Sequence, residues 1–453
     1  MLVSKRIAAL VAMGFLVGAC GSTTPTPSVS SPSGSAAGGS AAASVSNVPV
    51  TLSIWGGYPE MDAVWNAAAA AYQATHPNFK LTVFSTADLR GFEQKLATAL
   101  PSKTAGDIIF DDDPFMSQFV DKDLMAPAPP SVQAFMNGGA FSKALLDRVT
   151  YKGNIWSVPN RSSTKALYYN IDMFNAAGIS EPPHTVDEIL ADAAKLVQRD
   201  SSGNVVRSGI SLRWSGQGSG VGEKFEIWME QYGGSLLTQT SPGSPGKYTA
   251  GYNTASGLAA LQIYVNALKD KIDDPRIASD TKAFESQGTA MYIREPNVIA
   301  DIAKNAPTLV GHYGTVHLPV GSWSGLTSLY VPAASPNQGA AWDFIRFLAE
   351  PAQQLSIPTI AGWLPARFDI NTADFLAKNP TYSGFLSLPA DFVLYVDPAL
   401  PEFSEIETKL STHLVSAFTD TSLAGNPSKM MDLLNQWAAE TNAILTQNGH
   451  FGG

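Results

Sequence analysis

The chain has 453 residues, of which 45% are hydrophobic and 15% charged, and its formal net charge is −10. A chain of this length usually exceeds what one hydrophobic core serves, so we expect two lobes. The acidic balance argues against nucleic acid and anionic lipid surfaces as partners, because both would repel the protein.

The first 20 residues have the features of a bacterial export signal. Lys5 and Arg6 precede an apolar run over residues 7–18, which is too short to span a membrane permanently. The following Ala19-Cys20 completes a sequence similar to a lipobox, in which a peptidase cuts before an acylated cysteine. Cys20 is the chain's only cysteine, so no disulfide explains it. We therefore expect residues 1–20 to be a lipoprotein signal peptide with Cys20 as the lipid attachment site; a simple secretory signal is the alternative.

Residues 21–48 consist almost entirely of Gly, Ser, Ala, Thr and Pro and carry no charge. Such a segment has too few large apolar side chains to pack a core. It predicts a disordered tether between the lipid and a folded body.

The body begins with alternating strand and helix patterns. Apolar residues at every second position predict strands over residues 50–55 and 80–85 with a helix between them, and a helix over 92–100 precedes a short apolar strand at 107–110. This order predicts an α/β lobe with a parallel sheet.

Ligands of open α/β sheets bind beyond the carboxyl ends of the strands. Trp55, Tyr58 and Glu60 follow the first predicted strand, and Asp112 and Asp113 follow the third. Aromatic rings and carboxylates suit a sugar, which presents an apolar ring face and many hydroxyls. The alternatives are that Trp55 packs at the rim of the lobe and that the acids cap the next helix.

The segment from Tyr151 to Val197 leaves one compact unit and begins another. Residues 155–158 and 166–169 predict two short strands, and the polar patch 160–165 between them predicts a crossing between lobes. Thr185 and Glu188 form a capping box that begins a new helix. Past this hinge, residues 205–214 predict a strand, and residues 225–232 and 258–268 predict helices of the second lobe.

The same segment carries the residues of a known family signature. They are Tyr151-Lys152-Gly153 with Trp156-Ser157-Val158-Pro159, then Ala166-Leu167-Tyr168-Tyr169-Asn170 with Phe174, Ala177-Gly178 and Pro183. In this order they resemble the family 1 extracellular solute-binding proteins of ABC importers, the group that includes maltose-binding protein.

The resemblance implies an α/β, two-lobed periplasmic-binding-protein-like fold of type II, with discontinuous lobes joined by a hinge and a ligand cleft between them. It implies an N-terminal lobe of residues 49–163 plus 322–370 and a C-terminal lobe of residues 164–321 plus 371–453. Residues 362–367 are similar to the family's turn at the lobe border, which would bring Trp363 and Arg367 to the cleft.

Residues 283–297 are similar to another motif of the family but depart from it at two positions. Glu295 stands where the family usually has Gly, and Asn297 stands where it usually has Trp. The aromatic platform common at this turn is therefore missing, which disfavours a maltodextrin-like ligand.

The remaining candidates come from the hinge and the second lobe. We expect Arg161 and Ser163 on the floor of the cleft, although Arg161 could instead form a salt pair between the lobes. Arg294 and Glu295 occupy the binding turn, where they could also pair with each other, and the alternative for Arg367 is a surface or interlobe pair. The full set of predicted ligand-binding residues is Trp55, Tyr58, Glu60, Asp112, Asp113, Arg161, Ser163, Trp214, Glu223, Arg294, Glu295, Gly325, Trp363 and Arg367.

These features together predict a substrate-binding lipoprotein of an ABC importer. It would capture a mono- or oligosaccharide by hinge closure and deliver it to the permease. We expect an extracytoplasmic monomer that is anchored to the bacterial cell membrane by lipidated Cys20. We expect no cofactor, no metal, no catalytic residue and no nucleic-acid partner.

Three alternatives remain open at this stage. A glycerophosphodiester or another polyol phosphate could pair with Arg161, Arg294 and Arg367. A cationic solute could be held by residues 111–113. A secreted glycoside hydrolase could use paired carboxylates, such as Asp112 with Glu223 or Glu295.

Overall fold

The computed structural model describes residues 48–112, 118–215, 220–243, 245–277, 280–367, 369–398 and 400–453. All of them belong to one compact unit, Val45–Gly453. The predicted signal peptide, Cys20, the tether up to residue 47 and Asp113 lie outside the described residues. Among the described helices, none combines the length and the apolar character needed to cross a bilayer.

The first sheet has seven strands within the described ranges, in the order β17-β7-β16-β3-β1-β2, with β4 paired to β16. Strands β2 and β3 run parallel to β1, whereas β16 is antiparallel to β3 and β7. The strands are β1 (Val50–Gly56), β2 (Phe79–Ser85), β3 (Ile108–Asp112), β4 (Met125–Ala126), β7 (Ser157–Ser163), β16 (Gly325–Pro332) and β17 (Leu364–Pro365).

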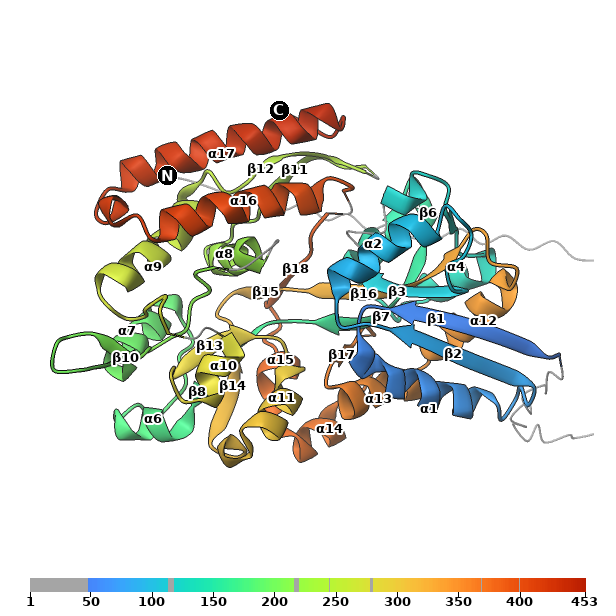
Figure 1. Ribbon diagram of the computed structural model, residues 1–453, viewed down its shortest axis with the longest axis horizontal. Coiled ribbons are helices and arrows are strands. Elements are labelled where there is room, and N and C mark those ends of the chain that lie inside the picture. Colours follow the sequence, from blue (N-terminus) through green and yellow to red (C-terminus); the bar gives the residue numbers. More distant parts are fainter. Residues whose placement is uncertain are drawn as a thin grey trace, which may run out of the picture. The chain divides into compact units, whose positions relative to one another are not determined.

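Helices cover both faces of the first sheet. Successive residues of a strand point to opposite sides, so neighbouring residues of β3 pack into different cores. Ile108 and Phe110 pack into a core with α1 (Asp62–Tyr72), α12 (Gln338–Leu348) and α13 (Pro351–Ala361). Ile109, between them, packs on the other face with Phe92 and Leu96 of α2 (Leu89–Ala99). Figure 1 shows α1 and α13 on one side of β1 and β3 and α2 on the other. The predicted strand-helix order of this region is confirmed.

The second sheet consists, in the described residues, of three antiparallel strands in the order β13-β8-β14. These are β8 (Ala166–Asn170), β13 (Met291–Arg294) and β14 (Tyr313–His317). Leu167 of β8 points into the larger core, and its neighbour Tyr168 points into a smaller aromatic core on the opposite face. The larger core is built with α7 (Val186–Leu196), α8 (Gly220–Glu230), α9 (Ala255–Lys269), α16 (Phe403–Phe418) and α17 (Pro427–Gln447).

Two local predictions in this region have different outcomes. The capping box is present, since Thr185 Oγ1 accepts from Glu188 N at 3.1 Å and Glu188 accepts from the Thr185 backbone. The predicted strand at 205–214 is wrong in length, because β10 covers only Val205–Arg207. Farther along, Leu212 N and Trp214 Nε1 donate to the buried carboxylate of Asp273 instead of extending the β10 pairing.

The chain crosses between the sheets at two neighbouring places. Strand β7 ends at Ser163 and β8 begins at Ala166, so Thr164-Lys165 joins the first sheet to the second. Strand β15 (Gly321–Trp323) enters β16 after a single residue and pairs in parallel with β18 (Val393–Tyr395). Figure 1 shows β15, β16 and β7 running between the two groups of elements. The exact lobe boundaries stay a prediction.

The remaining strands and α-helices are short or peripheral. They are β5 (Thr150–Tyr151), β6 (Asn154–Ile155), β9 (Gln198–Arg199), β11 (Leu237–Ser241), β12 (Lys247–Ala250), α4 (Pro130–Met136), α5 (Lys143–Val149), α6 (Ile171–Ala176), α10 (Asp280–Glu285), α11 (Val298–Asn305), α14 (Ala373–Lys378) and α15 (Ser383–Leu386).

Candidate ligand-binding site

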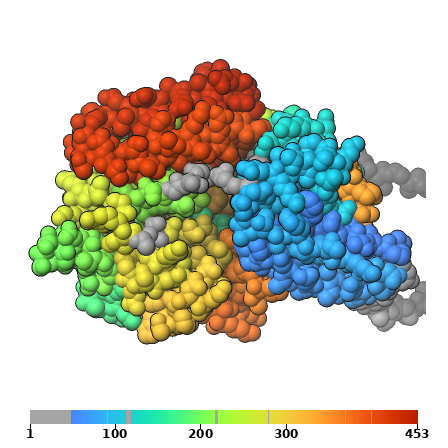
Figure 2. All heavy atoms as spheres, viewed as in Figure 1, coloured from blue at the N-terminus to red at the C-terminus, as the bar shows by residue number. Residues whose placement is uncertain are grey.

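A cavity of about 490 Å³ lies where the chain crosses between the two sheets. Figure 2 shows a recess between the blue N-terminal segments on one side and the green and yellow segments on the other, below the red C-terminal helices. The lining residues are Tyr58, Glu60, Leu89, Glu93, Asp112, Arg148, Arg161, Ser163, Lys165, Glu223, Arg294, Glu295, Asn297, Trp323, Gly325, Leu326, Thr327, Trp363, Asp397, Phe403, Ser404 and Glu407.

The wall formed by the first sheet is centred on Asp112, at the end of β3. Its Oδ2 accepts from the Tyr58 hydroxyl at 2.6 Å, and its Oδ1 accepts from Thr327 Oγ1 at 2.6 Å. Burial, followed by the charge of Asp112, raises the pKa of Tyr58 well above its ordinary value, so this phenol remains a donor. Two neutral hydroxyls therefore hold the carboxylate in one orientation.

Arg161 is held beside this carboxylate mainly by aromatic rings. Its guanidinium lies 4.1 Å from the Tyr58 ring centroid and 3.7 Å from the Trp363 centroid, while Nη2 is 4.0 Å from Asp112 Oδ1. Trp363 in turn donates from Nε1 to Glu60 Oε1 at 3.0 Å. Cation-π contact stabilises a buried guanidinium, and here it also covers one face of the Trp363 ring. Trp363 therefore supports Arg161 as well as lining the cavity.

The wall formed by the second sheet is centred on Lys165, whose side chain is only 1% exposed. Its Nζ pairs with Glu295 Oε1 and, at 3.0 Å, with Glu223 Oε1, and it lies 4.4 Å from the Trp323 ring centroid. Burial would lower the pKa of Lys165, but Glu223 and Glu295 together raise it. The ammonium therefore stays charged at the crossing between the sheets.

The two carboxylates of this wall are held ionised by several cations. Burial would raise the pKa of Glu295, but Arg294, Lys165 and Lys224 lower it well below its ordinary value. Burial likewise opposes ionisation of Glu223, yet Lys165 and Lys224 lower its pKa. Both carboxylates can therefore act as hydrogen-bond acceptors toward the cavity.

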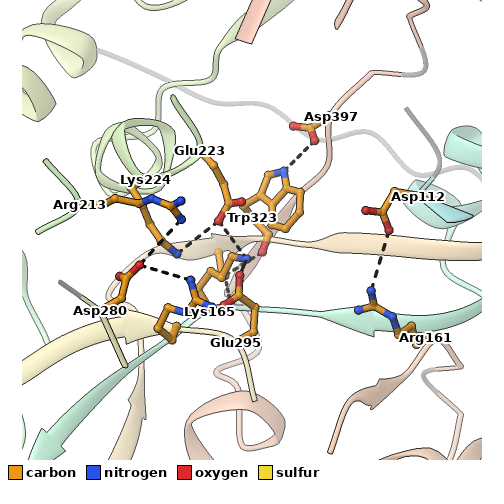
Figure 3. Close-up of polar contacts among 12 residues, drawn as sticks. Asp112, Arg161, Lys165, Arg213, Glu223, Lys224, Asp280, Glu295, Trp323 and Asp397 are labelled. Atoms are coloured by element: carbon orange, nitrogen blue, oxygen red, sulfur yellow. Dashed lines mark hydrogen bonds and ion pairs between the residues drawn. The ribbon is translucent and has the colours of Figure 1, made fainter. Parts of the chain in front are cut away.

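The ion pairs continue behind the wall (Figure 3). Arg294 Nε lies 2.9 Å from Glu295 Oε2, and Arg294 Nη1 lies 3.6 Å from Asp280 Oδ2. Arg213 Nη1 lies 3.8 Å from the same Asp280 oxygen. Arg294 and Glu295 therefore pair with each other, as the sequence analysis allowed, while both line the cavity.

Trp323 and Asp397 line the cavity next to each other. Trp323 Nε1 donates to Asp397 Oδ2 at 2.8 Å, and Arg148 donates to the backbone carbonyl of Asp397 with Nη2 3.8 Å from its Oδ2. A Cβ at position 325 would lie 2.6 Å from two ring carbons of Trp323 and from Ser163 Oγ. Only glycine fits beside this indole without displacing it.

The model of the bacterial extracellular solute-binding protein family matches residues 67–384. The chain belongs to this family. The curated relatives of this solute-binding protein include a putative binding protein of Brucella abortus, which is 26% identical over 389 residues, 83% of this chain and 88% of that protein. A lactose-binding protein of Rhizobium radiobacter is 24% identical over 66% of this chain and 67% of that protein. The sn-glycerol-3-phosphate-binding periplasmic protein of Brucella abortus is 25% identical over 72% of this chain and 70% of that protein.

Solved structures of binding proteins share the fold. An ABC transporter solute-binding protein from Thermotoga lettingae, bound with α-D-tagatose, matches with a TM-score of 0.68 at 22% identity, over 86% of this chain and 99% of that one. The GacH receptor of Streptomyces glaucescens, solved unliganded and with acarbose, matches with a TM-score of 0.72 at 20% identity, over 90% of this chain and 100% of that one. The predicted two-lobed α/β fold of type II is therefore confirmed.

The solute-binding protein brings most of the predicted site residues together. Lining the cavity are Tyr58, Glu60, Asp112, Arg161, Ser163, Glu223, Arg294, Glu295, Gly325 and Trp363. Their contact with a ligand stays a prediction, and Asp113 lies outside the described residues.

Three predicted residues lie away from the cavity. Trp55 packs against Phe84 at 5.1 Å between ring centroids, with Lys95 Nζ over its ring, as the rim-packing alternative held. Trp214 is buried in the second core, where its Nε1 donates to Asp273 at 2.7 Å. Arg367 pairs with Asp369 at 2.6 Å and donates to the Ala349 carbonyl.

Sequence reasoning missed Lys165, Trp323, Asp397 and Arg148. Lys165 stood in the polar patch of the hinge, and Trp323 stood two residues before the predicted Gly325, so both carried a local signal. Asp397 and Arg148 carried none, because they meet across 249 residues of chain. Within the described ranges, no group of His, Cys, Asp and Glu has the arrangement needed to hold a metal ion.

Proposed function

We propose that this solute-binding protein is the substrate-binding lipoprotein of an ABC importer and that it captures a neutral mono- or oligosaccharide between its lobes. The observation that carries the proposal is the cavity wall in which Glu223 and Glu295 are kept ionised by buried Lys165 beside the Trp323 indole. Oriented acceptors next to a ring suit a ligand that has hydroxyl donors and an apolar face.

The charge pattern disfavours the polyol-phosphate alternative, although one relative binds sn-glycerol-3-phosphate by name. Arg161 is enclosed by two rings beside Asp112, and Arg294 is paired with Glu295 and Asp280. Arg367 pairs with Asp369 away from the cavity. A phosphate would have to displace carboxylate partners to reach these cations, which a neutral saccharide need not do.

Neither Glu223 nor Glu295 suits the role of general acid in the glycosidase alternative. A general acid in a glycosidase needs a carboxyl whose pKa is raised, so that it is protonated at neutral pH. The cations around Glu223 and Glu295 lower both pKa values despite burial. The family consists of binding proteins, which is the simpler account of these carboxylates.

The extracellular family places the protein outside the cytoplasm. Lipid attachment at Cys20, delivery to an ABC permease, action as a monomer and hinge closure belong to our proposal. Closure would follow from contacts that a ligand makes with both walls, since only differential affinity for the closed form shifts the equilibrium.

A thermal-shift screen tests the proposed function on the full chain purified in mild detergent. The panel contains mono- and oligosaccharides, sn-glycerol-3-phosphate, glycerophosphodiesters and polyamines. A saccharide present at 100 times its Kd should stabilise the protein by about 2.7 kcal/mol. Stabilisation by phosphates alone would establish the polyol-phosphate alternative. Release of reducing ends that stops in Glu223→Gln or Glu295→Gln would establish the enzyme.

A further inference from the structure

The orientation of the Trp323 indole is fixed by three contacts at the cavity. Its Nε1 donates to Asp397, Lys165 lies 4.4 Å from its ring centroid, and Gly325 leaves no room for a Cβ beside it. Figure 3 shows the ring with its N–H directed toward Asp397. A platform of this kind favours binding when it is already oriented in the free protein.

Asp397 holds the indole, and Arg148 holds Asp397. Arg148 donates to the Asp397 backbone carbonyl and places Nη2 3.8 Å from Oδ2, which is the oxygen that accepts from Trp323. The side chains of Arg148 and Asp397 are 1% and 6% exposed, so water screens their interaction little. Arg148 therefore helps to fix the position of this carboxylate.

The two partners belong to different parts of the fold. Arg148 lies on α5, whose Leu145 and Val149 pack into the core of the first sheet. Asp397 follows β18 and precedes Leu400, which packs into the core of the second sheet. Their contact therefore spans the two cores at the edge of the cavity.

We propose that Arg148 is a positioning residue for ligand binding, which sets the Trp323 indole through Asp397 and so couples the arrangement of the two cores to the site. This inference rests on the proposed function. The geometry also has an electrostatic reason, because burial and the charge of Glu223 raise the pKa of Asp397, whereas Arg148 opposes this rise. Without a cation on its other side, this carboxylate would be a poorer and less fixed acceptor for the indole N–H.

A double-mutant cycle distinguishes positioning from a general structural role. The Kd of a saccharide from the screen is measured for the full chain, Arg148→Gln, Trp323→Phe and the double variant. We expect Arg148→Gln to weaken binding about tenfold in the wild-type background, the loss of one hydrogen bond to a charged group. In the Trp323→Phe background it should add almost nothing, because the two changes remove the same interaction. Equal weakening in both backgrounds, or none in either, overturns the proposal.

Arg207→Gln is the matched control. Arg207 donates to the Leu196 carbonyl from β10 and lies outside the cavity lining. We expect the Arg207→Gln variant to bind the saccharide with the same Kd as the wild type. If Arg148→Gln does not fold, Asp397→Asn replaces it in the cycle, because its amide oxygen can still accept from the indole but no longer carries charge toward Arg148.

The indole N–H resonance of Trp323 provides a readout that needs no ligand. It is assigned by its disappearance in Trp323→Phe, and we expect it to shift in Arg148→Gln and to remain unchanged in Arg207→Gln. An unchanged resonance in Arg148→Gln overturns the positioning role even if saccharide binds. A shifted resonance in a protein that binds no saccharide overturns the proposed function and leaves the link between Arg148 and the indole intact.

Discussion

The two walls of the cavity stabilise buried charge in different ways. On the first-sheet wall, one cation, Arg161, lies between two aromatic rings, and Asp112 accepts from two neutral hydroxyls. On the second-sheet wall, Lys165 and Arg294 are paired directly with Glu223 and Glu295. Removing one side chain from the first wall breaks a ring contact or a hydrogen bond to a neutral group, whereas removing Lys165 from the second wall takes away a cation that two buried carboxylates share.

The largest effect should follow Lys165→Met. The change leaves Glu223 and Glu295 buried without their shared cation, so we expect a loss of about 3–5 kcal/mol in the free energy of unfolding and loss of ligand binding. Urea denaturation measures the first and calorimetric titration the second. Lys143→Met is the control, because its pair with Asp147 is exposed, at 86% and 64%, and should contribute little. If both variants behave alike, the second wall does not depend on its ion pairs.

The next largest effect should follow Gly325→Ala, which tests the packing between the walls. The new methyl would stand 2.6 Å from the Trp323 ring and from Ser163 Oγ. We expect a destabilisation of about 1–3 kcal/mol and weaker ligand binding, because the indole must move. Gly339→Ala in α12 is the control, since a Cβ there meets nothing within 4 Å. A Gly325→Ala protein that is stable and binds normally would show that the indole is not confined.

A smaller effect is expected for Arg161→Lys on the first-sheet wall. Lysine keeps the charge but loses the planar group that stacks between Tyr58 and Trp363. We expect affinity to fall by about 1 kcal/mol, because lysine keeps the charge and with it part of the roughly 2 kcal/mol of a desolvated cation-π contact, with the melting temperature nearly unchanged. A loss as large as that of Lys165→Met would mean that the two walls are equally dependent on charge pairing.

The smallest effect, at mildly acidic pH, is expected for Glu230→Gln on α8, behind the second wall. Burial, then Glu226 and Asp397, raise the pKa of Glu230 well above its ordinary value. The folded protein therefore keeps a proton that the unfolded chain releases above about pH 4.3, so the carboxyl costs stability as pH rises through that window. Glutamine does not titrate, so the stability difference should grow from pH 4.5 to pH 8 in thermal melts. A constant difference would show that Glu230 is ionised in the folded protein.

Helix α8 carries glutamates whose pKa values shift in opposite directions. Glu223 faces Lys165 and Lys224, and its pKa is lowered. Burial raises the pKa values of Glu226 and Glu230 on the same helix. The same residue type on one helix thus takes opposite protonation states, which no property of the helix sequence indicates.

The sequence predicted the fold through features that depend on neighbouring residues. The alternation in 50–55 and 80–85 became β1 and β2, and Thr185 and Glu188 cap α7 as expected. The strand at 205–214 was predicted too long, because Ser208 and Ser211 make only isolated bridges to residues 289 and 292, and Leu212 N bonds to the Asp273 side chain about 60 residues away in the chain. Local sequence does not show contacts with distant residues, which is also why Trp214 was expected at the cavity but lies in a core.

Local pattern by itself determined the strands, the helix caps, the position of the crossing between the sheets and the residue types at the strand ends. Only the tertiary structure decided which charges meet: Lys165 pairs with Glu295 across 130 residues, and Arg148 with Asp397 across 249. The physical reason is that backbone conformation responds to adjacent side chains, whereas the strength and protonation of a buried ion pair depend on groups that only folding brings together.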